Sequence, residues 1–167
     1  MSGFHHRHVD LATGAFLRPF FLGLLGDAVV QAHRDEVPLV LLYVDLDEAA
    51  LVKEEWGQAA LEAAVSSLAQ ALGAAVDGLG PIGRMDDDSF GVLLMGCPYP
   101  HAMRIAHAVR KRVAEQPVRT ETDTFSITAS VGVAALRSAE PWGNLLEAAE
   151  AACIRAKQGG RNRVAPR

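Results

Sequence analysis

Hydrophobic residues follow helical and then strand spacing in the first third of the chain. From Phe16 to about His33 they recur every three or four positions, and Pro19 falls where a first helical turn tolerates proline. The run VPLVLLYV (37–44) is continuously apolar and ends in the acids Asp45 and Asp47. This pattern predicts a helix and then a buried strand that carries both carboxylates to one side of its end.

In the middle of the chain, the spacing of the hydrophobic residues changes three times. Residues 51–75 are rich in Ala, Leu and Glu and predict one long helix, or a helix broken at Gly57. Glycines and a proline in DGLGPIGRM (77–85) precede the strand-like DSFGVLLMG (88–96), which predicts a β-hairpin with Asp86–Asp88 at its tip. Residues 101–116 then predict an amphipathic helix with a basic outer face.

The last third contains a strand, a helix and a short return. FSITASVGVAAL (125–136) predicts a strand, and residues from 142 onward predict a helix closed by Gly159 and Gly160, with NRV (162–164) as an edge strand. Alternating helices and strands with one hairpin predict a single-domain α/β sandwich. We expect a mixed central β-sheet flanked by helices, with the β-hairpin that carries the three aspartates as part of it.

Composition narrows the class of protein. Half of the 167 residues are hydrophobic and 22% are charged, which suits one globular domain with a packed core. The net charge of -4 means that basic residues are not in excess to attract anionic partners. Neither nucleic acid nor a membrane surface is therefore expected as a partner. Cys97 and Cys153 lack zinc or disulfide spacing. We therefore expect buried thiols in a reducing, cytoplasmic compartment.

The N-terminal FHHRH (4–8) allows two interpretations. It is either a metal-binding tract or, as is usual for histidines near a chain end, a solvated segment. The second interpretation is favoured, with residues 1–9 predicted as a flexible segment and 10–167 as the domain.

Several segments together resemble the GGDEF domain of diguanylate cyclases. DLATGAFLRPFF (10–21) is similar to the family's opening D-x-L-T-G-L-x-N-R-x-x-F, and VDLD (44–47) resembles the strand with its first metal aspartate. SVGVA (130–134) and AKQGGRN (156–162) resemble a late strand and the helix end A-K-x-x-G-R-N. The matches span nearly the whole chain in order, so the resemblance implies the nucleotidyl-cyclase-like fold.

The signature hairpin of the family is altered in this sequence. Aligned on Phe90, the motif G-G-D/E-E-F becomes Asp86, Asp87, Asp88, Ser89 and Phe90. In the family, the glycines let the backbone approach a GTP phosphate. Aspartate can adopt left-handed turn geometry, so the hairpin is expected to form. However, each carboxylate ~5 Å from a phosphate charge costs roughly 3 kcal/mol at an effective dielectric of about 20.

The resemblance also identifies metal positions. It places a metal-binding aspartate at Asp45 and the third motif position at Asp88, whereas Ser89 replaces the motif glutamate. The family's reaction joins two GTP molecules held by facing protomers with metal assistance, so losing this carboxylate leaves the metal set incomplete. No cofactor is required under this reading. An Asp cluster binding Mg²⁺ and an acidic, solvated hairpin tip both stay open, the second being favoured.

Changes extend to the guanine and phosphate positions. The family's base-reading Asn and Asp fall on Lys53 and Glu62; Glu62 can accept hydrogen bonds from guanine, whereas Lys53 offers only donors. Lys157 and Arg161 match a phosphate-contacting pair. They would either bind an anion or simply stabilise the end of a helix.

The family's inhibitory motif R-x-x-D falls on Asp77 and Gly80, so neither residue type is retained. Binding of cyclic di-GMP there is therefore not expected, and the altered hairpin argues against GTP binding. The sequence predicts a catalytically inactive regulatory or protein-interaction module in bacterial cyclic di-GMP-related signalling, with an unidentified protein partner. A residual GTP/Mg²⁺ binder and a weakly active diguanylate cyclase, which would need a homodimer, remain the alternatives.

Overall fold

A computed structural model describes residues 7–167 of the chain. Residues 1–6, including most of the histidine-rich tract, lie outside the described part. In chain order the elements are α1 (Arg18–Asp35), β1 (Leu39–Leu46), α2 (Ala49–Trp56), α3 (Gln58–Val76), β2 (Ile82–Asp86), β3 (Ser89–Met95), α4 (Tyr99–Glu115), β4 (Val118–Arg119), β5 (Thr124–Phe125), β6 (Ala129–Ala135), α5 (Trp142–Gln158) and β7 (Val164–Pro166).

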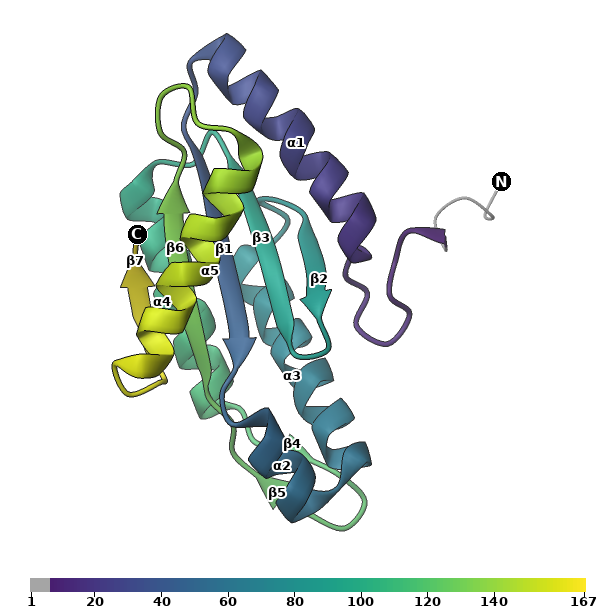
Figure 1. Cartoon of the computed structure of the whole chain (residues 1–167). Helices are drawn as coiled ribbons and strands as arrows, with labels where there is room; N and C mark the ends of the chain where they lie inside the picture. The colour runs from purple at the N-terminus through teal and green to yellow at the C-terminus, as the bar shows by residue number, and fades with distance from the viewer. Residues whose placement is uncertain (1–6) are drawn as a thin grey trace.

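A mixed central sheet organises the described residues, in the order β2-β3-β1-β6-β7. Pairing is antiparallel from β2 through β6, and β7 joins β6 in parallel. Figure 1 shows α1 and α5 on one face and α3 and α4 on the other. The predicted α/β sandwich with a mixed sheet is confirmed, including the hairpin and the edge strand that follows the last helix.

Two predicted boundaries were wrong. The strand expected over 125–136 is divided: Thr124–Phe125 pairs with Val118–Arg119 in a separate small ribbon, and β6 begins only at Ala129. The apolar pattern runs through the break because Phe125 and Ile127 are both buried. The first helix starts at Arg18 rather than Phe16, whose backbone instead bonds to Ile82 and Arg84 beside β2.

The helix predicted over 51–75 is broken at Gly57, one of the two forms that the sequence allows. Gly57 has a φ of 92°, in the left-handed region that favours glycine, and it ends α2 and begins α3. Helix α3 is long and apolar enough to meet a length-and-composition test for a membrane span. Its buried residues belong to the core that it forms with the sheet and α4, and they make up 39% of this apolar stretch.

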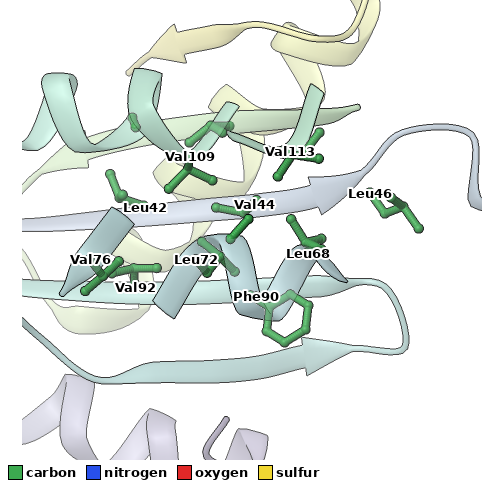
Figure 2. Packing of buried hydrophobic residues seen from close by; sticks show 14 of the residues in the cluster. Leu42, Val44, Leu46, Leu68, Leu72, Val76, Phe90, Val92, Val109 and Val113 are labelled. Atoms are coloured by element: carbon green, nitrogen blue, oxygen red, sulfur yellow. The ribbon is translucent and has the colours of Figure 1, made fainter. Parts of the chain in front are cut away.

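Side chains of β1 and β3 fill the core beneath α3 and α4. Figure 2 shows Leu72 and Val109, from the two helices, on either side of Val44, with Val92 and Phe90 along the neighbouring strand. Phe90 is fully buried. Thus the motif position that survives at Phe90 anchors the hairpin in this core.

The opposite core lies beneath α1 and α5. Phe21 is completely buried, and a Cβ at Gly83 would stand 2.2 Å from its Cγ atom. Only a residue without a side chain fits at this point of β2. The helix and the hairpin strand are therefore in direct contact.

The two chain segments at the ends of the domain are tied to it. His8 stacks on Phe20 with ring centroids 4.4 Å apart, and Val9 forms a bridge with Phe16, although both belong to the segment predicted to be flexible. Near the other end, the buried Glu140 carboxylate accepts hydrogen bonds from Arg167.

Candidate functional site

The triple aspartate lies at the free end of the β2–β3 hairpin, as predicted. Asp86 pairs with Ser89, Asp87 and Asp88 form the turn, and a bulge interrupts the pairing between Arg84 and Asp86. None of the three aspartates has a positive φ, so the left-handed geometry proposed for them was wrong. The bulge supplies the extra residue and local twist that the turn needs. The Asp88 carbonyl accepts a hydrogen bond of 3.0 Å from the Leu46 N–H, which fixes the tip beside the end of β1.

Asp45 forms an ion pair with a lysine from α5. The Lys157 Nζ lies 3.2 Å from Asp45 Oδ2 and donates a second bond of 3.2 Å to the Leu46 carbonyl. Burial, reinforced by the charge of Asp88, raises the pKa of Asp45 to about 6, although Lys157 acts in the opposite direction. Asp45 Oδ1 is buried without a hydrogen-bond partner among residues 7–167. Lys157 thus neutralises a strand carboxylate rather than serving only the helix end.

Ser89, at the motif's glutamate position, faces inward. It lies opposite Asp45 in the β1–β3 ladder and is 1% exposed. The Tyr43 hydroxyl lies 3.3 Å from Ser89 Oγ. Burial raises the pKa of Tyr43 to about 12, so this phenol stays neutral at physiological pH. The position therefore offers a buried hydroxyl instead of a carboxylate.

Asp47 has a structural role that the sequence analysis did not identify. Its buried carboxylate accepts hydrogen bonds of 2.7 Å from both Thr128 and Ser130, and one of 2.9 Å from the Asn162 backbone N–H. Ser130 pairs with Asp45 across the sheet, so Asp45 and Asp47 share one side, as predicted. The bond to Asn162 connects β1 to the loop after α5.

In that loop, two residues other than glycine also have positive φ values. Arg161 and Asn162 have φ of 62° and 45°, following Gly160 at 123°. The carboxylate of Asp47 holds the backbone in this conformation by accepting the Asn162 N–H. Arg161 is exposed in the loop, and Lys157 is turned toward Asp45, so the structure does not bring the predicted anion-binding pair onto a shared partner.

Arg84 joins the hairpin to the N-terminal segment. Its guanidinium donates to Asp10 Oδ2 at 2.8 Å and to the Asp87 carbonyl at 2.7 Å. Burial of Asp10 is outweighed by hydrogen bonds from Thr13 and Arg84, which hold the pKa of its carboxyl below the ordinary value. The matches at Asp10 and Thr13 therefore have a physical role, since they brace the hairpin tip. The amino-acid sequence alone had indicated no role for Arg84.

Lys53 and Glu62 line the same cavity, of about 490 Å³, between the α2–α3 corner and the hairpin. Arg84 and Asp87 close its other side, and Leu61 and Val65 supply apolar walls. Acceptor, donor and apolar groups together could seat a planar polar ring. The structure thus brings the two predicted base-reading positions together, next to the hairpin.

The inhibitory-motif positions lie apart from this cavity, in the turn between α3 and β2. Asp77 caps α3 in a left-handed conformation with φ of 50°. A Cβ at Gly80 would stand 1.8 Å from the Leu93 carbonyl oxygen, so this backbone leaves no room for a side chain there. The family's aspartate would therefore require a different path of the turn.

The predicted metal positions, Asp45 and Asp88, adjoin but do not form a ligand cage. Among residues 7–167, no group of three or more His, Cys, Asp or Glu side chains is arranged to hold a metal ion. The orphaned Asp45 Oδ1 is a possible ligand atom, yet Lys157 covers Oδ2 and the Leu46 carbonyl. Because Ser89 adds no carboxylate, the arrangement as it stands does not fit a resident Mg²⁺ ion.

Comparison with known proteins identifies the family to which this chain belongs. Residues 7–163 match the family described as "Diguanylate cyclase, GGDEF domain". An uncharacterized Bacillus subtilis protein, YhcK, is 30% identical over 160 residues, which cover 94% of this chain and 45% of YhcK. The chain spans less than half the length of the curated relatives that it matches.

Solved structures of the same family superpose closely. The GGDEF domain of DgcB from Caulobacter crescentus, in complex with c-di-GMP, gives a TM-score of 0.92 at 21% identity, covering 96% of this chain and 93% of that chain. Diguanylate cyclase SiaD from Pseudomonas aeruginosa, in complex with its activator SiaC, gives 0.92 at 27% identity, covering 98% and 63%.

Proposed function

Because this chain belongs to the GGDEF domain family of diguanylate cyclases, we propose that it acts in cyclic di-GMP signalling as a regulatory, protein-interaction domain without cyclase activity. The motif is degenerate under this proposal. The observation that carries the proposal is that two motif side chains already have partners inside the protein. Asp45 is ion-paired with Lys157, and Ser89 is buried against Tyr43. A metal-dependent phosphoryl transfer would need these positions to supply carboxylates to a cation.

The hairpin adds a second obstacle to phosphate binding. Asp87 lines the 490 Å³ cavity and Asp86 lines the adjoining hollow of about 770 Å³, so substrate phosphates would meet two extra carboxylates. At ~5 Å and an effective dielectric of about 20, each repulsion costs roughly 3 kcal/mol. Arg84 offsets part of this repulsion but is already shared between Asp10 and the hairpin backbone.

Binding of a partner protein has a precedent in the family, since the SiaD structure contains its activator SiaC. Binding of cyclic di-GMP also has one, in the DgcB complex. For this chain, Asp77 and the tight contact of Gly80 argue against the inhibitory site that the family resemblance implies. The proposal therefore assigns the domain a protein partner rather than a nucleotide effector. Its cytoplasmic location remains a prediction.

A second candidate function is binding of GTP without turnover. The cavity with Lys53 and Glu62 favours it, because a carboxylate accepts from the guanine N1–H and N2–H groups while an ammonium donates to O6. This function would keep the base cavity and lose the phosphate site. The two candidates differ in whether GTP binds, and both exclude formation of cyclic di-GMP.

The experiment is calorimetric titration with GTP and with cyclic di-GMP in the presence of Mg²⁺, followed by chromatography for the product after incubation with GTP. We expect no product and no binding of either nucleotide. The matched variant D86G/D87G/S89E restores the motif, and its affinity for GTP should exceed that of the wild type by about 100-fold or more. GTP binding without product would support the second candidate, and cyclic di-GMP formed by the wild-type protein would refute both.

A further inference from the structure

Trp56 lies at the outer end of α2, against the small ribbon formed by β4 and β5. Its ring stacks on Phe125, with centroids 5.4 Å apart and planes inclined by 7°. It nevertheless remains 36% exposed, and Leu51 on the same helix is 49% exposed. Figure 1 shows α2 and the ribbon together at the end of the molecule toward which β1 runs. An aromatic ring held in place by stacking, yet accessible to solvent, has the character of a binding anchor.

Trp56 lines two separate hollows. One of about 210 Å³ lies between α2 and residues 125–128, and Trp56, Leu51 and Phe125 supply its apolar wall. Another of about 350 Å³ lies between the start of α3 and the loop of residues 120–123, and Trp56 lines it as well. The two hollows therefore share the indole as a wall, which suits an extended segment with side chains entering both.

The charge around the hollows is of a single sign. Glu48 and Glu55 line the first, and Glu121 and Asp123 line the second. Within the described part of the chain, no lysine or arginine lines either hollow, and none of these four carboxylates takes part in an ion pair. The lysine on α2 lines the other cavity, beside Glu62. We call this surface, made of Leu51, Trp56 and the four carboxylates, the Trp56 face.

We infer that the Trp56 face binds a basic segment of a partner protein through at least one arginine. A guanidinium can stack on the indole while pairing with a neighbouring carboxylate, a combination that lysine cannot reproduce. Carboxylates around the ring would repel nucleic acid and anionic lipid. This inference rests on the proposed function as an interaction domain and names the chemistry of the partner.

A second copy of this chain fits the surface less well. Its exposed basic residues, for example Arg104 and Lys111 on α4, do not line this surface. In a two-fold dimer each copy would have to place both these residues and its Trp56 face against its partner at once, which is a stricter requirement than seating one extended segment. The arginine-bearing segment of a different protein is therefore the occupant to which the inference commits.

The test is a selection of random peptides displayed on phage against the immobilised wild-type protein, with the affinity of selected peptides measured by fluorescence polarisation. We expect the selected peptides to be enriched in arginine and to bind more weakly as salt is added. Their affinity should fall about tenfold or more in E121Q/D123N, which removes one exposed and one half-buried charge that both lie outside the core. The control E147Q/E150Q, on the exposed side of α5, should bind like the wild type.

Several outcomes would overturn the inference. They are a selection that yields no binders, binders without arginine enrichment, and binders that retain full affinity for E121Q/D123N. Self-association that E121Q/D123N abolishes, measured by analytical ultracentrifugation, would identify a second copy as the occupant instead. Cyclic di-GMP formation would refute the proposed lack of catalysis whatever peptides are selected, whereas a failed selection would refute only the Trp56 face.

Discussion

Replacement of Asp45 by asparagine should stabilise the protein at alkaline pH. The change keeps the size of the side chain and removes a negative charge that burial and Asp88 make costly. Asparagine retains a carbonyl oxygen that can accept the bond from Lys157. We therefore expect the gain from removing the charge to exceed the loss of the ion pair.

The magnitude follows from the pKa of Asp45, which folding raises from 3.8 to about 6. Each unit corresponds to about 1.36 kcal/mol, so ionisation destabilises the fold by up to about 3 kcal/mol above pH 6. Below pH 3.8 the carboxyl is protonated in both states, and the stability of that form is lost as pH rises from 3.8 through 6. At pH 4.5 the cost is only about 1 kcal/mol.

The assay is urea unfolding of D45N and wild type at pH 8 and pH 4.5, followed by tryptophan fluorescence with EDTA present. The free energy of unfolding of D45N should exceed that of wild type by up to about 3 kcal/mol at pH 8 and by about 1 kcal/mol at pH 4.5. E147Q, which removes an exposed charge, serves as the control. An equal gain at both pH values would refute the charge argument, and a loss at pH 8 would show that the Lys157 pair is net stabilising.

Further predictions concern packing and ion pairs. G132A should cost about 3 kcal/mol because its Cβ would stand 2.2 Å from a carbonyl oxygen of α5, whereas G143A, in open space, should stay within about 0.5 kcal/mol; thermal melts compare them. A double-mutant cycle of D10A and R84A should give a coupling energy of about 1 kcal/mol by urea unfolding, and a value near zero would remove the proposed brace. Hydrogen bonds from Arg167 lower the pKa of the Glu140 carboxyl below its ordinary value of 4.5. The stabilisation of the fold by this ion pair is therefore present above pH 4.5 and is lost as the pH falls through the lowered pKa. E140Q should accordingly lose about 1–3 kcal/mol at pH 7 and progressively less as the pH is lowered below 4.5, measured by urea unfolding, and a loss that does not change with pH would contradict this account.

Local signals were sufficient to predict most elements of the fold. The uninterrupted apolar run before Asp45 identified β1, because a strand buried on both faces carries apolar residues at successive positions instead of alternating with polar ones. Gly57 marked the break between α2 and α3, since the chain turns there with a φ of 92°, a conformation that glycine adopts without strain. The hairpin and its acidic tip followed from the glycines and proline before β2 and from the turn residues that precede the apolar strand β3.

The partner of each charged side chain was decided by tertiary structure. Lys157 lies 111 positions from Leu46, whose carbonyl it meets, and Asn162 lies 115 positions from Asp47. The packing of α5 against β1 and the path of the loop after α5 bring these groups together, and no local sequence pattern encodes such packing. The same cause hides the inward turn of Ser89 and the joint cavity of Lys53 and Glu62.

The order of the main helices and strands, and the residue types that replace the family motif, could be predicted from the amino-acid sequence, because both depend on neighbours along the chain. Tertiary structure alone decided that Lys157 neutralises Asp45, that Arg84 braces the hairpin and that Trp56 stays exposed among carboxylates. Charged and aromatic side chains can choose among many partners. Their choice is set only when packing fixes which of them come within a few ångströms of one another.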